Sequence, residues 1–376
     1  MRKVLITGAQ GFIGKNLALH LSERRDIEVV PFTRDTPVDA LPALLEGVDT
    51  VFHLAGVNRP QDPQEFTTGN ADLTRALCAA LQARATRGLP APSVLYTSST
   101  QAANDNPYGR SKQAAEQALF DLQRSHGVPV HVFRLPNVFG KWCRPNYNSA
   151  VATFCHNTTR GLPIQVNDPA APLTLVYVDD VIARFLQLMD GAVASVDALG
   201  FATLTPQYTT TVGNVARQIQ GFRASRDTQV IDRVGTGFTR ALYSTYVSYL
   251  PPEDFAYALT RHGDARGVFV EMLKTPDCGQ FSFFTAHAGI TRGGHYHHTK
   301  TEKFLVIQGQ ACFRFRHMLT GETHELHTHA DRPQVVETVP GWTHDITNTG
   351  TQEMVVMLWA NEIFDRERPD TYACPV

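Results

Sequence analysis

The chain has 376 residues, a length that predicts two domains at roughly 150 residues each. Its 43% hydrophobic and 19% charged residues are typical of a globular protein and exclude disorder, collagen and coiled coils. With 34 Lys and Arg against 36 Asp and Glu, the formal net charge of -2 argues against nucleic acid or an anionic membrane surface as a partner. Since no run approaches the ~20 apolar residues of a membrane helix, we expect a soluble, cytoplasmic protein.

Strands and helices alternate in the first half of the sequence. Short apolar runs predict buried strands at Lys3–Ile6, Glu28–Pro31, Thr50–His53, Ser93–Thr97 and Val130–Arg134. Helical patterns follow Gly14, occupy Asn70–Ala85 and Ser111–Ser125, and recur within the strand-to-helix segment Val176–Leu188. This alternation predicts an α/β fold with a doubly wound parallel sheet.

The pattern changes after the proline pair Pro251–Pro252. From Gly267 onward, short strand candidates are separated by Gly and Asn and lack helical periodicity, which predicts an all-β part. These candidates are Phe281–Thr285, Glu302–Ile307, Ala311–Arg316, Gln334–Val339 and Met354–Ala360. We therefore predict an α/β domain over residues 1–250 and an all-β domain over residues 251–376.

A glycine-rich turn follows the first predicted strand. Gly8, Gly11 and Gly14 surround Phe12 and Ile13 in the segment GAQGFIG. Glycines at such a turn let a pyrophosphate approach backbone N–H groups at a helix N-terminus, where the helix dipole favours anions. The position directly after a strand predicts a dinucleotide cofactor.

The residue after the second strand bears on which dinucleotide is bound. The sequence has Arg34 in a region where NAD-binding domains place an acidic residue. A guanidinium suits the 2′-phosphate of NADPH, which we therefore predict as the cofactor. Two alternatives stay open at this point: Asp35 could supply the acidic group, and Arg34 could be a solvated surface residue.

A tyrosine and a lysine share one face of a predicted helix. Tyr108 and Lys112 are four residues apart, so they lie one turn from each other. A nearby ammonium lowers the pKa of a phenol and makes it a general acid or base near neutrality. Ser99, at the end of the preceding strand, could hydrogen-bond the same substrate oxygen. Together with the glycine turn, these residues predict a catalytic site.

The first 245 or so residues resemble an extended short-chain dehydrogenase/reductase of the nucleotide-sugar branch. The matching segments, in order, are TGAQGFIG, His53–Gly56, Tyr108–Lys112, Arg134–Gly140 and Tyr177–Val181. The resemblance implies a Rossmann domain with a small substrate-binding lobe, and it adds Leu54, Ala55 and Gly56 to the cofactor site. It implies Tyr108 as proton donor, Lys112 on the nicotinamide ribose and Ser99 on the reacting oxygen.

Two points of this resemblance concern the substrate side. Ser99 lies only nine residues before Tyr108, where the family has a longer loop, so we expect a short lid. Asn137, in the matching RLPNVFG segment, is a substrate-binding candidate. Arg144 is a second candidate for contact with the substrate. The equal alternative is that the loop containing Arg144 has only a structural role.

Nine of the fifteen histidines fall between His287 and His344. In an extended strand, His295 and His297 point to one side, and Glu302 can join them from the next strand. With His344, these side chains form a plausible site for zinc or another divalent ion. His298 is the competing ligand.

The glycine, histidine and glutamate spacing resembles the two-part cupin signature, and this resemblance covers about 110 residues. The second part departs from the signature, because Pro340 stands directly before Gly341. The resemblance implies a jelly-roll barrel of the RmlC-like type.

A reductase followed by a cupin is similar, end to end, to the CapF-type family of capsular polysaccharide synthesis enzymes. This resemblance implies two steps on a UDP-linked 4-keto-6-deoxy-N-acetylhexosamine: C3 epimerisation in the cupin, then NADPH-dependent reduction at C4. The product would be UDP-N-acetyl-L-talosamine, a precursor of UDP-N-acetyl-L-fucosamine. Candidate epimerase bases are His297, His298 and Lys300, and a homodimer is expected because both families commonly dimerise.

Two other functions remain open from the sequence. The reductase could be the only catalyst, with the cupin serving assembly or stability. Alternatively, the chain could be a non-catalytic NADPH-sensing protein with a degenerate site, although an intact Ser99, Tyr108 and Lys112 set argues against that reading.

Overall fold

The computed structural model describes residues 1–260, 262–264, 267–269, 272–273, 275, 279–362, 365 and 367–376. The chain forms two compact units, and each of them draws on two separate stretches of sequence. The first unit comprises Met1–Phe139 and Leu173–Thr209; the second comprises Gly140–Pro172 and Thr210–Val376. The domain boundary near residue 250 stays a prediction from the sequence. Within the described residues, no helix is both long and apolar enough to span a membrane.

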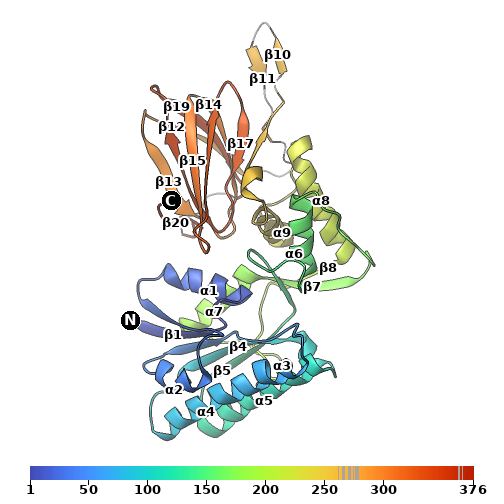
Figure 1. The fold of residues 1–376 in the computed structure, drawn as a ribbon, viewed down its shortest axis with the longest axis vertical. Coiled ribbons are helices and arrows are strands. Elements are labelled where there is room, and N and C mark those ends of the chain that lie inside the picture. Colours follow the sequence, from blue (N-terminus) through green and yellow to red (C-terminus); the bar gives the residue numbers. More distant parts are fainter. Residues whose placement is uncertain are drawn as a thin grey trace. The chain divides into compact units, whose positions relative to one another are not determined.

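The first unit is built on a five-stranded sheet with the order β2-β1-β3-β4-β5 (Figure 1). Its strands, which all pair in parallel, are β1 (Arg2–Thr7), β2 (Ile27–Phe32), β3 (Thr50–His53), β4 (Ser93–Ser99) and β5 (Val130–Leu135). Because helices cover both faces, the central strands are fully buried, and Val4, Leu5 and Ile6 are each 0% exposed. The predicted parallel sheet is confirmed.

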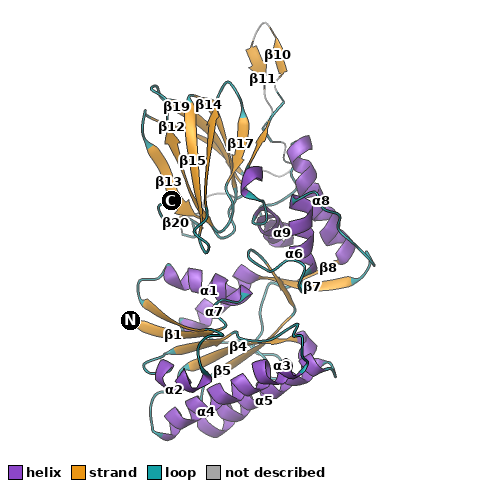
Figure 2. Ribbon diagram, viewed as in Figure 1, coloured by secondary structure: helices purple, strands orange, loops and turns teal. Residues whose placement is uncertain are grey.

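Helices lie on both faces of this sheet. Figure 2 shows α1 and α7 on one face and α4 and α5 on the other. The helices of the first unit are α1 (Phe12–Ser22), α2 (Leu41–Leu44), α3 (Gln64–Phe66), α4 (Leu73–Thr86), α5 (Pro107–His126) and α7 (Val178–Met189). The strand order reverses between β1 and β3, and ligands bind in α/β sheets outside the carboxyl ends of strands at such a switch point. A further sheet joins β6 (Asn137–Phe139), β7 (Pro172–Tyr177) and β8 (Tyr208–Thr211).

The second unit combines helices with two antiparallel sheets. Its helices α6 (Ala150–Thr159), α8 (Val212–Thr228) and α9 (Gly237–Val247) contact one another. One sheet has the order β12-β19-β14-β17-β9, with bounds Gln280–Ala286, Met354–Ala360, Glu302–Gln308, Gln334–Glu337 and Ala256–Ala258. The other has the order β16-β15-β18-β13-β20, with bounds Thr323–His329, Gln310–His317, Trp342–Asn348, Thr291–Tyr296 and Tyr372–Ala373. A separate hairpin pairs β10 (His262–Asp264) with β11 (Gly267–Phe269).

The two five-stranded sheets pack face to face as a sandwich. Phe304 of β14 meets Phe313 of β15 across the core, with ring centroids 5.8 Å apart. Along β15, the alternation of buried Phe313 and Phe315 with exposed Arg314 gives one inner and one outer face. The all-β character predicted for this part is confirmed. To the strands expected from the sequence, the two sheets add β9, β16, β18 and β20, and they give limits to the extended strand expected at His295, which is β13.

A buried group of charges joins helix α8 to the sandwich. Arg226 of α8 and Lys303 of β14 both contact the carboxylate of Glu337 on β17. Burial opposes ionisation of Glu337, but the two cations prevail and lower its pKa to about 2. Both cations also lie about 5 Å from the ring of Tyr257, at 5.0 Å and 5.2 Å from its centroid. The helix is therefore an integral part of the second unit.

Candidate active site and metal centre

The glycine turn lies between the end of β1 and the start of α1. Gly8 has a positive φ of 70°, and a Cβ on Gly14 would lie 2.2 Å from the Gly8 carbonyl oxygen. Only glycine allows this approach. Gly11, the N-cap of α1, has no side-chain cap, and the first turn of the helix has no acidic residue. The free N–H groups and the dipole of this helix end suit a pyrophosphate.

The end of β3 completes the same edge of the sheet. The backbone N–H groups of Leu54 and Ala55 donate to Thr7 Oγ1 at 3.1 Å and 3.2 Å. A Cβ on Gly8 would lie 2.8 Å from Ala55 Cα, so the two loops are in close contact. The structure thus brings the predicted cofactor residues of both loops together at the switch point, whereas Arg34 is exposed beyond the end of β2. The cofactor roles themselves remain predictions.

Ser99, Tyr108 and Lys112 come from the end of β4 and the first turns of α5. Asn106 caps this helix by accepting from Gly109 N at 2.8 Å, and Pro107 occupies the first helical position. The Ser99 side chain lies near enough to Tyr108 to lower the pKa of its phenol, and Ser99 Oγ accepts from Gln101 N at 3.1 Å. The Lys112 ammonium is buried and donates to the Thr97 carbonyl at 3.0 Å. The predicted residues are therefore close to one another at the carboxyl end of the sheet.

The pKa of Tyr108 differs from the sequence-based expectation. Burial raises it above the ordinary value of a tyrosine, and the Ser99 side chain opposes this effect. The lowering expected from Lys112 is not found. Burial also lowers the pKa of Lys112 to about 8, which Glu116 partly opposes. The sequence showed the spacing of the two groups but not their shared desolvation.

Asn70 is a site residue that the sequence reasoning missed. It lies in a π-helical turn, Thr67–Asp72, that precedes α4. Its amide oxygen accepts from Val57 N at 2.8 Å, and its amide nitrogen donates to Ser111 Oγ at 3.0 Å. A Cβ on Gly56 would lie 2.9 Å from Asn70 Oδ1 and 3.2 Å from Lys112 Nζ. Asn70 therefore ties the loop after β3 to the helix that carries Tyr108 and Lys112.

A buried histidine continues this network to the glycine turn. His53 hydrogen-bonds Thr7 Oγ1 at 2.7 Å and Thr74 Oγ1 at 2.8 Å. Burial lowers its pKa to about 3, and the charge of Lys112 acts in the same direction. His53 therefore remains neutral and links β1, β3 and α4. The sequence placed His53 in the family-matching HLAG segment, but it gave no sign that the imidazole bonds the hydroxyls of Thr7 and Thr74.

The two substrate-binding candidates are both exposed. Asn137 opens β6 in the first unit, and Arg144 belongs to the second unit, where its guanidinium lies 5.2 Å from the ring centroid of Tyr147. Their contact with a substrate remains a prediction.

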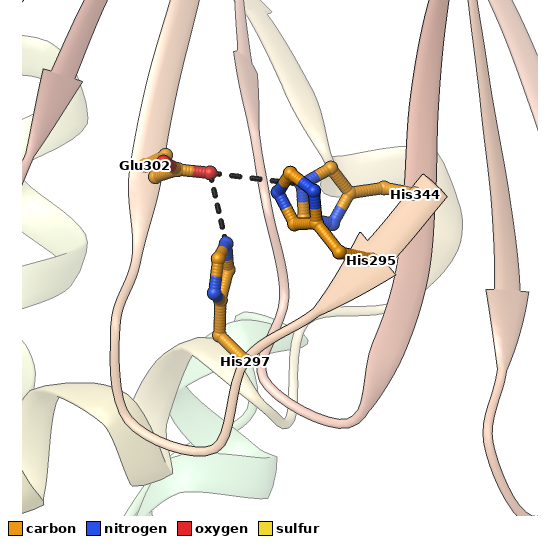
Figure 3. Close-up of side chains that lie close together, drawn as sticks. All are labelled: His295, His297, Glu302 and His344. Atoms are coloured by element: carbon orange, nitrogen blue, oxygen red, sulfur yellow. Dashed lines mark hydrogen bonds and ion pairs between the residues drawn. The ribbon is translucent and has the colours of Figure 1, made fainter. Parts of the chain in front are cut away.

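His295, His297, Glu302 and His344 converge inside the sandwich (Figure 3). One ligand atom of each lies within 4.8 Å of the others. Glu302 Oε2 is 3.0 Å from His297 Nε2 and 3.6 Å from His344 Nε2. The histidines come from β13, the following loop and β18, since β13 ends at Tyr296. His297 lies one residue past the end of β13, yet its ring converges with that of His295 as predicted, with centroids 5.0 Å apart.

The electrostatics of this cluster suit a cation. Burial lowers the pKa of His295 to about 3, assisted by His344, and burial also lowers the pKa of His344, so both are neutral ligand donors. Burial opposes ionisation of Glu302, but His297 keeps the pKa of this carboxyl well below its ordinary value. Among the described residues, neither ring nitrogen of buried His344 has a hydrogen-bond partner. A divalent ion would satisfy such an imidazole.

The structure separates His297 from its competitor. His298 is not part of the four-residue cluster. Its ring lies against Tyr296 and Tyr372, at centroid distances of 5.5 Å and 5.0 Å. Lys300, another candidate base, donates from Nζ to Thr371 Oγ1 at 2.7 Å.

Comparison with known proteins gives family matches over both parts of the chain. Residues 4–197 match the model described as the NAD dependent epimerase/dehydratase family, and residues 262–372 match the polysaccharide biosynthesis C-terminal domain. The UDP-2-acetamido-2,6-beta-L-arabino-hexul-4-ose reductase of Pseudomonas aeruginosa is 60% identical over 374 residues, covering 100% of this chain and 99% of the relative. The crystal structure of the capsular polysaccharide assembling protein CapF from Staphylococcus aureus matches with a TM-score of 0.66 at 42% identity, covering 99% of this chain and 100% of that chain.

Proposed function

The chain belongs to the NAD dependent epimerase/dehydratase family and matches its reductase relative end to end, and we propose that it reduces the 4-keto group of a UDP-linked 2-acetamido-2,6-dideoxyhexulose. The observation that carries this proposal is the placement of Ser99, Tyr108 and Lys112 at the switch-point edge of the sheet, beside the glycine turn. We place this role in capsular polysaccharide precursor synthesis, in keeping with the similarity to the capsular polysaccharide assembling protein CapF.

Each of these residues has a defined task in the reduction. A bound nicotinamide cofactor supplies the hydride for C4. Tyr108 donates a proton to the oxygen that becomes negative, and its raised pKa keeps the proton on the phenol at neutral pH. Ser99 would hydrogen-bond the same oxygen, and Lys112 would contribute positive charge to the ribose of the bound cofactor. The glycine turn and the start of α1 hold the pyrophosphate.

We assign NADPH as the preferred cofactor because exposed Arg34 follows β2, where a guanidinium can pair with a 2′-phosphate. Arg34→Ala is expected to weaken NADPH binding by at least ~10-fold, the equivalent of one charge-assisted contact, and to leave NADH binding unchanged. Fluorescence titration with both cofactors measures the difference. An equal loss of affinity for NADPH and NADH would show that Arg34 does not recognise the 2′-phosphate.

The sandwich is proposed to invert C3 of the same sugar before reduction. The 4-ketone acidifies the C3 proton, so a base can remove it if the resulting enolate is stabilised. His295, His297, Glu302 and His344 fit a divalent ion such as zinc, because three imidazoles and one carboxylate bring one ligand atom each within 4.8 Å of the others. When bound, such an ion supplies Lewis acidity or holds the site together.

The base of this step is proposed to lie among His297, His298 and Lys300. His297 has both ring nitrogens engaged, by the Asp370 carbonyl and by Glu302, so it is the weakest of the three candidates in this geometry. His298 and Lys300 are both almost fully buried beside the C-terminal segment. His298→Asn and Lys300→Met are therefore the informative substitutions.

Incorporation of solvent deuterium at C3 of the 4-keto sugar, measured by NMR without NADPH, tests the epimerase step separately from the reduction. Wild type is expected to exchange C3, and His344→Ala is expected to lose exchange while keeping NADPH binding. The matched control is His327→Ala, since His327 lies on the outer face of the second sheet and is exposed. If exchange survives His344→Ala, the reductase is the only catalyst and the sandwich serves assembly or stability.

The product is then proposed to be UDP-N-acetyl-L-talosamine, on the route to UDP-N-acetyl-L-fucosamine. Mass spectrometry and NMR of the reduced product test this assignment. A cytoplasmic homodimer is the proposed working form, since both parts of the chain resemble families that commonly dimerise, and sedimentation of the purified protein measures its oligomeric state.

A further inference from the structure

The loop between β13 and β14 carries His297 at its start and Glu302 at its end. The backbone N–H groups of five consecutive residues, from His298 to Glu302, each donate to a side-chain oxygen from another segment. On the acceptor side, the His297 and Thr301 carbonyls receive backbone N–H groups of Gly341 and Asn361, so the loop is held from both its donor and its acceptor groups. Its conformation depends on the segments that supply these partners.

One carboxylate accepts the first three of these N–H groups. Asp370 accepts from His298 N at 2.9 Å, from Thr299 N at 2.8 Å and from Lys300 N at 2.7 Å. It also accepts from Thr299 Oγ1 at 2.9 Å. Successive N–H groups around one anion form a nest, and bonds to an ionised acceptor are about twice as strong as neutral ones. We call this arrangement the Asp370 clamp.

The same residue also contacts a candidate ligand through its backbone. The Asp370 carbonyl oxygen lies 2.6 Å from His297 Nδ1. Because a carbonyl can only accept, Nδ1 carries the proton, and the other nitrogen, Nε2, faces Glu302 at 3.0 Å. Such a bond fixes the tautomer and ring orientation of a metal-ligating histidine.

The backbone of Asp370 would not hold this position by itself. Its φ of 39° is in the left-handed region, where non-glycine residues are uncommon and Asp is tolerated. The segment around it is anchored independently, since Tyr372 stacks on Tyr296 and Cys374 N donates to the Gly294 carbonyl at 2.7 Å. These contacts hold the residues after Asp370, and the clamp holds Asp370 itself, so the clamp fixes where the Asp370 carbonyl meets His297.

We propose that Asp370 is a positioning residue of the metal centre: its carboxylate fixes the loop from His298 to Lys300, and its carbonyl orients His297 as a ligand. This inference rests on the proposed metal site, and it adds a contribution from the last residues of the chain. It is consistent with His297 rather than His298 as the ligand, because the Asp370 carbonyl contacts the His297 ring, whereas the His298 ring lies against Tyr296 and Tyr372.

The test is zinc affinity, measured by competition with a chromogenic chelator on the full chain. Asp370→Gly removes the carboxylate but keeps a residue that tolerates positive φ. Its zinc affinity is expected to fall ~10–100-fold, the usual effect of losing an outer partner of a ligand. Thr371→Val is the matched control, because it removes the neighbouring hydroxyl, which accepts from Lys300 Nζ and donates to the Pro369 carbonyl, and keeps all four acceptor bonds of the Asp370 carboxylate.

All of these proteins carry His327→Ala. This change takes one ligand away from Cys312, Glu325 and His327, a group of one buried and two exposed residues that could also take a metal ion and add background zinc. His344→Ala then tests whether the sandwich holds zinc at all, so a failed metal proposal is distinguished from a failed clamp. If wild type binds zinc through His344 and Asp370→Gly binds it as tightly as Thr371→Val does, the positioning role is overturned.

A second readout needs no metal. In the zinc-free protein, amide hydrogen exchange at Thr299 and Lys300 is expected to be slow in wild type and in Thr371→Val. In Asp370→Gly it is expected to accelerate by at least ~10-fold, because the acceptor of both N–H groups is gone. Unchanged exchange would show that the clamp does not hold the loop.

Discussion

Replacing Gly8 by alanine tests the close contact between the two loops of the proposed cofactor site. The change adds a Cβ at a positive φ of 70°, which costs ~1–2 kcal/mol for a side chain in the left-handed region. The Cβ would also lie 2.8 Å from both Cα and N of Ala55, so the loops must separate by about 0.7 Å to reach an ordinary contact of about 3.5 Å. They cannot separate freely, because Thr7 and His53 pair in register and Gly8 N donates to the Phe32 carbonyl at 2.9 Å.

Gly127→Ala is the matched control for this substitution. Gly127 ends α5 with nearly the same φ, 67°, but a Cβ there would have no atom within 4 Å. We expect both variants to lose ~1–2 kcal/mol of unfolding free energy in urea, and Gly8→Ala to lose at least ~1 kcal/mol more. Only Gly8→Ala should weaken NADPH binding, by at least ~10-fold in a fluorescence titration. Equal losses of stability together with equal NADPH affinities would refute the reasoning.

Three further outcomes follow from buried polar groups. His53 has a pKa of about 3 in the folded protein and 6.5 ordinarily, so on acidification the unfolded chain binds its proton first. The free energy of unfolding therefore falls as the pH drops from about 6.5 towards 3, by at most ~5 kcal/mol. His53→Gln should reduce this pH dependence in urea unfolding at several pH values, and an unchanged pH dependence would contradict the assignment. Glu337→Gln should lower the free energy of unfolding by ~3–5 kcal/mol because it leaves two buried cations without a counter-ion. Arg226→Met should lower it clearly less, because Lys303 and Glu337 remain as a neutral pair. Equal losses for the two variants in urea unfolding would show that the balance of buried charge does not decide the effect. Asn70→Ser should displace α5, which carries Tyr108 and Lys112, and lower kcat by at least ~10-fold while NADPH affinity is retained. An unchanged kcat would show that Asn70 has a purely structural role.

The parallel sheet could be predicted because its strands are short apolar runs that carry their own signal. Thr50–His53 has the same limits in the sequence prediction and in the structure. By contrast, β13 reads TRGGHY and was expected only as an extended segment around His295, without limits, because polar residues and glycines give no alternation that marks a buried face. Its place in the sheet depends on pairing with β18, a contact between segments about 50 residues apart.

The candidate sites divide in the same way. Residue type and spacing identified Tyr108 with Lys112, and the glycine turn, because each involves neighbours on one element. Asn70 was missed because a lone asparagine in a helical segment carries no pattern, and its partner Ser111 is 41 residues away. The raised pKa of Tyr108 was missed because desolvation depends on packing that the sequence does not display.

The discontinuous make-up of the two units has a consequence for how the chain can be synthesised or cut. The first unit has all of its residues once Thr209 has been made, whereas the second still needs strands that reach Ala373. Until residue 299 has been made, Ser244 of α9 has no Thr299 carbonyl to bind, and until residue 337 has been made, helix α8 has no Glu337 for its Arg226. A fragment ending at residue 250 would carry these helices without their partners, so we expect it to need a chaperone or to aggregate. A fragment made only of the first unit, residues 1–139 joined to 173–209, lacks these helices, and we expect it to stay in solution without a chaperone.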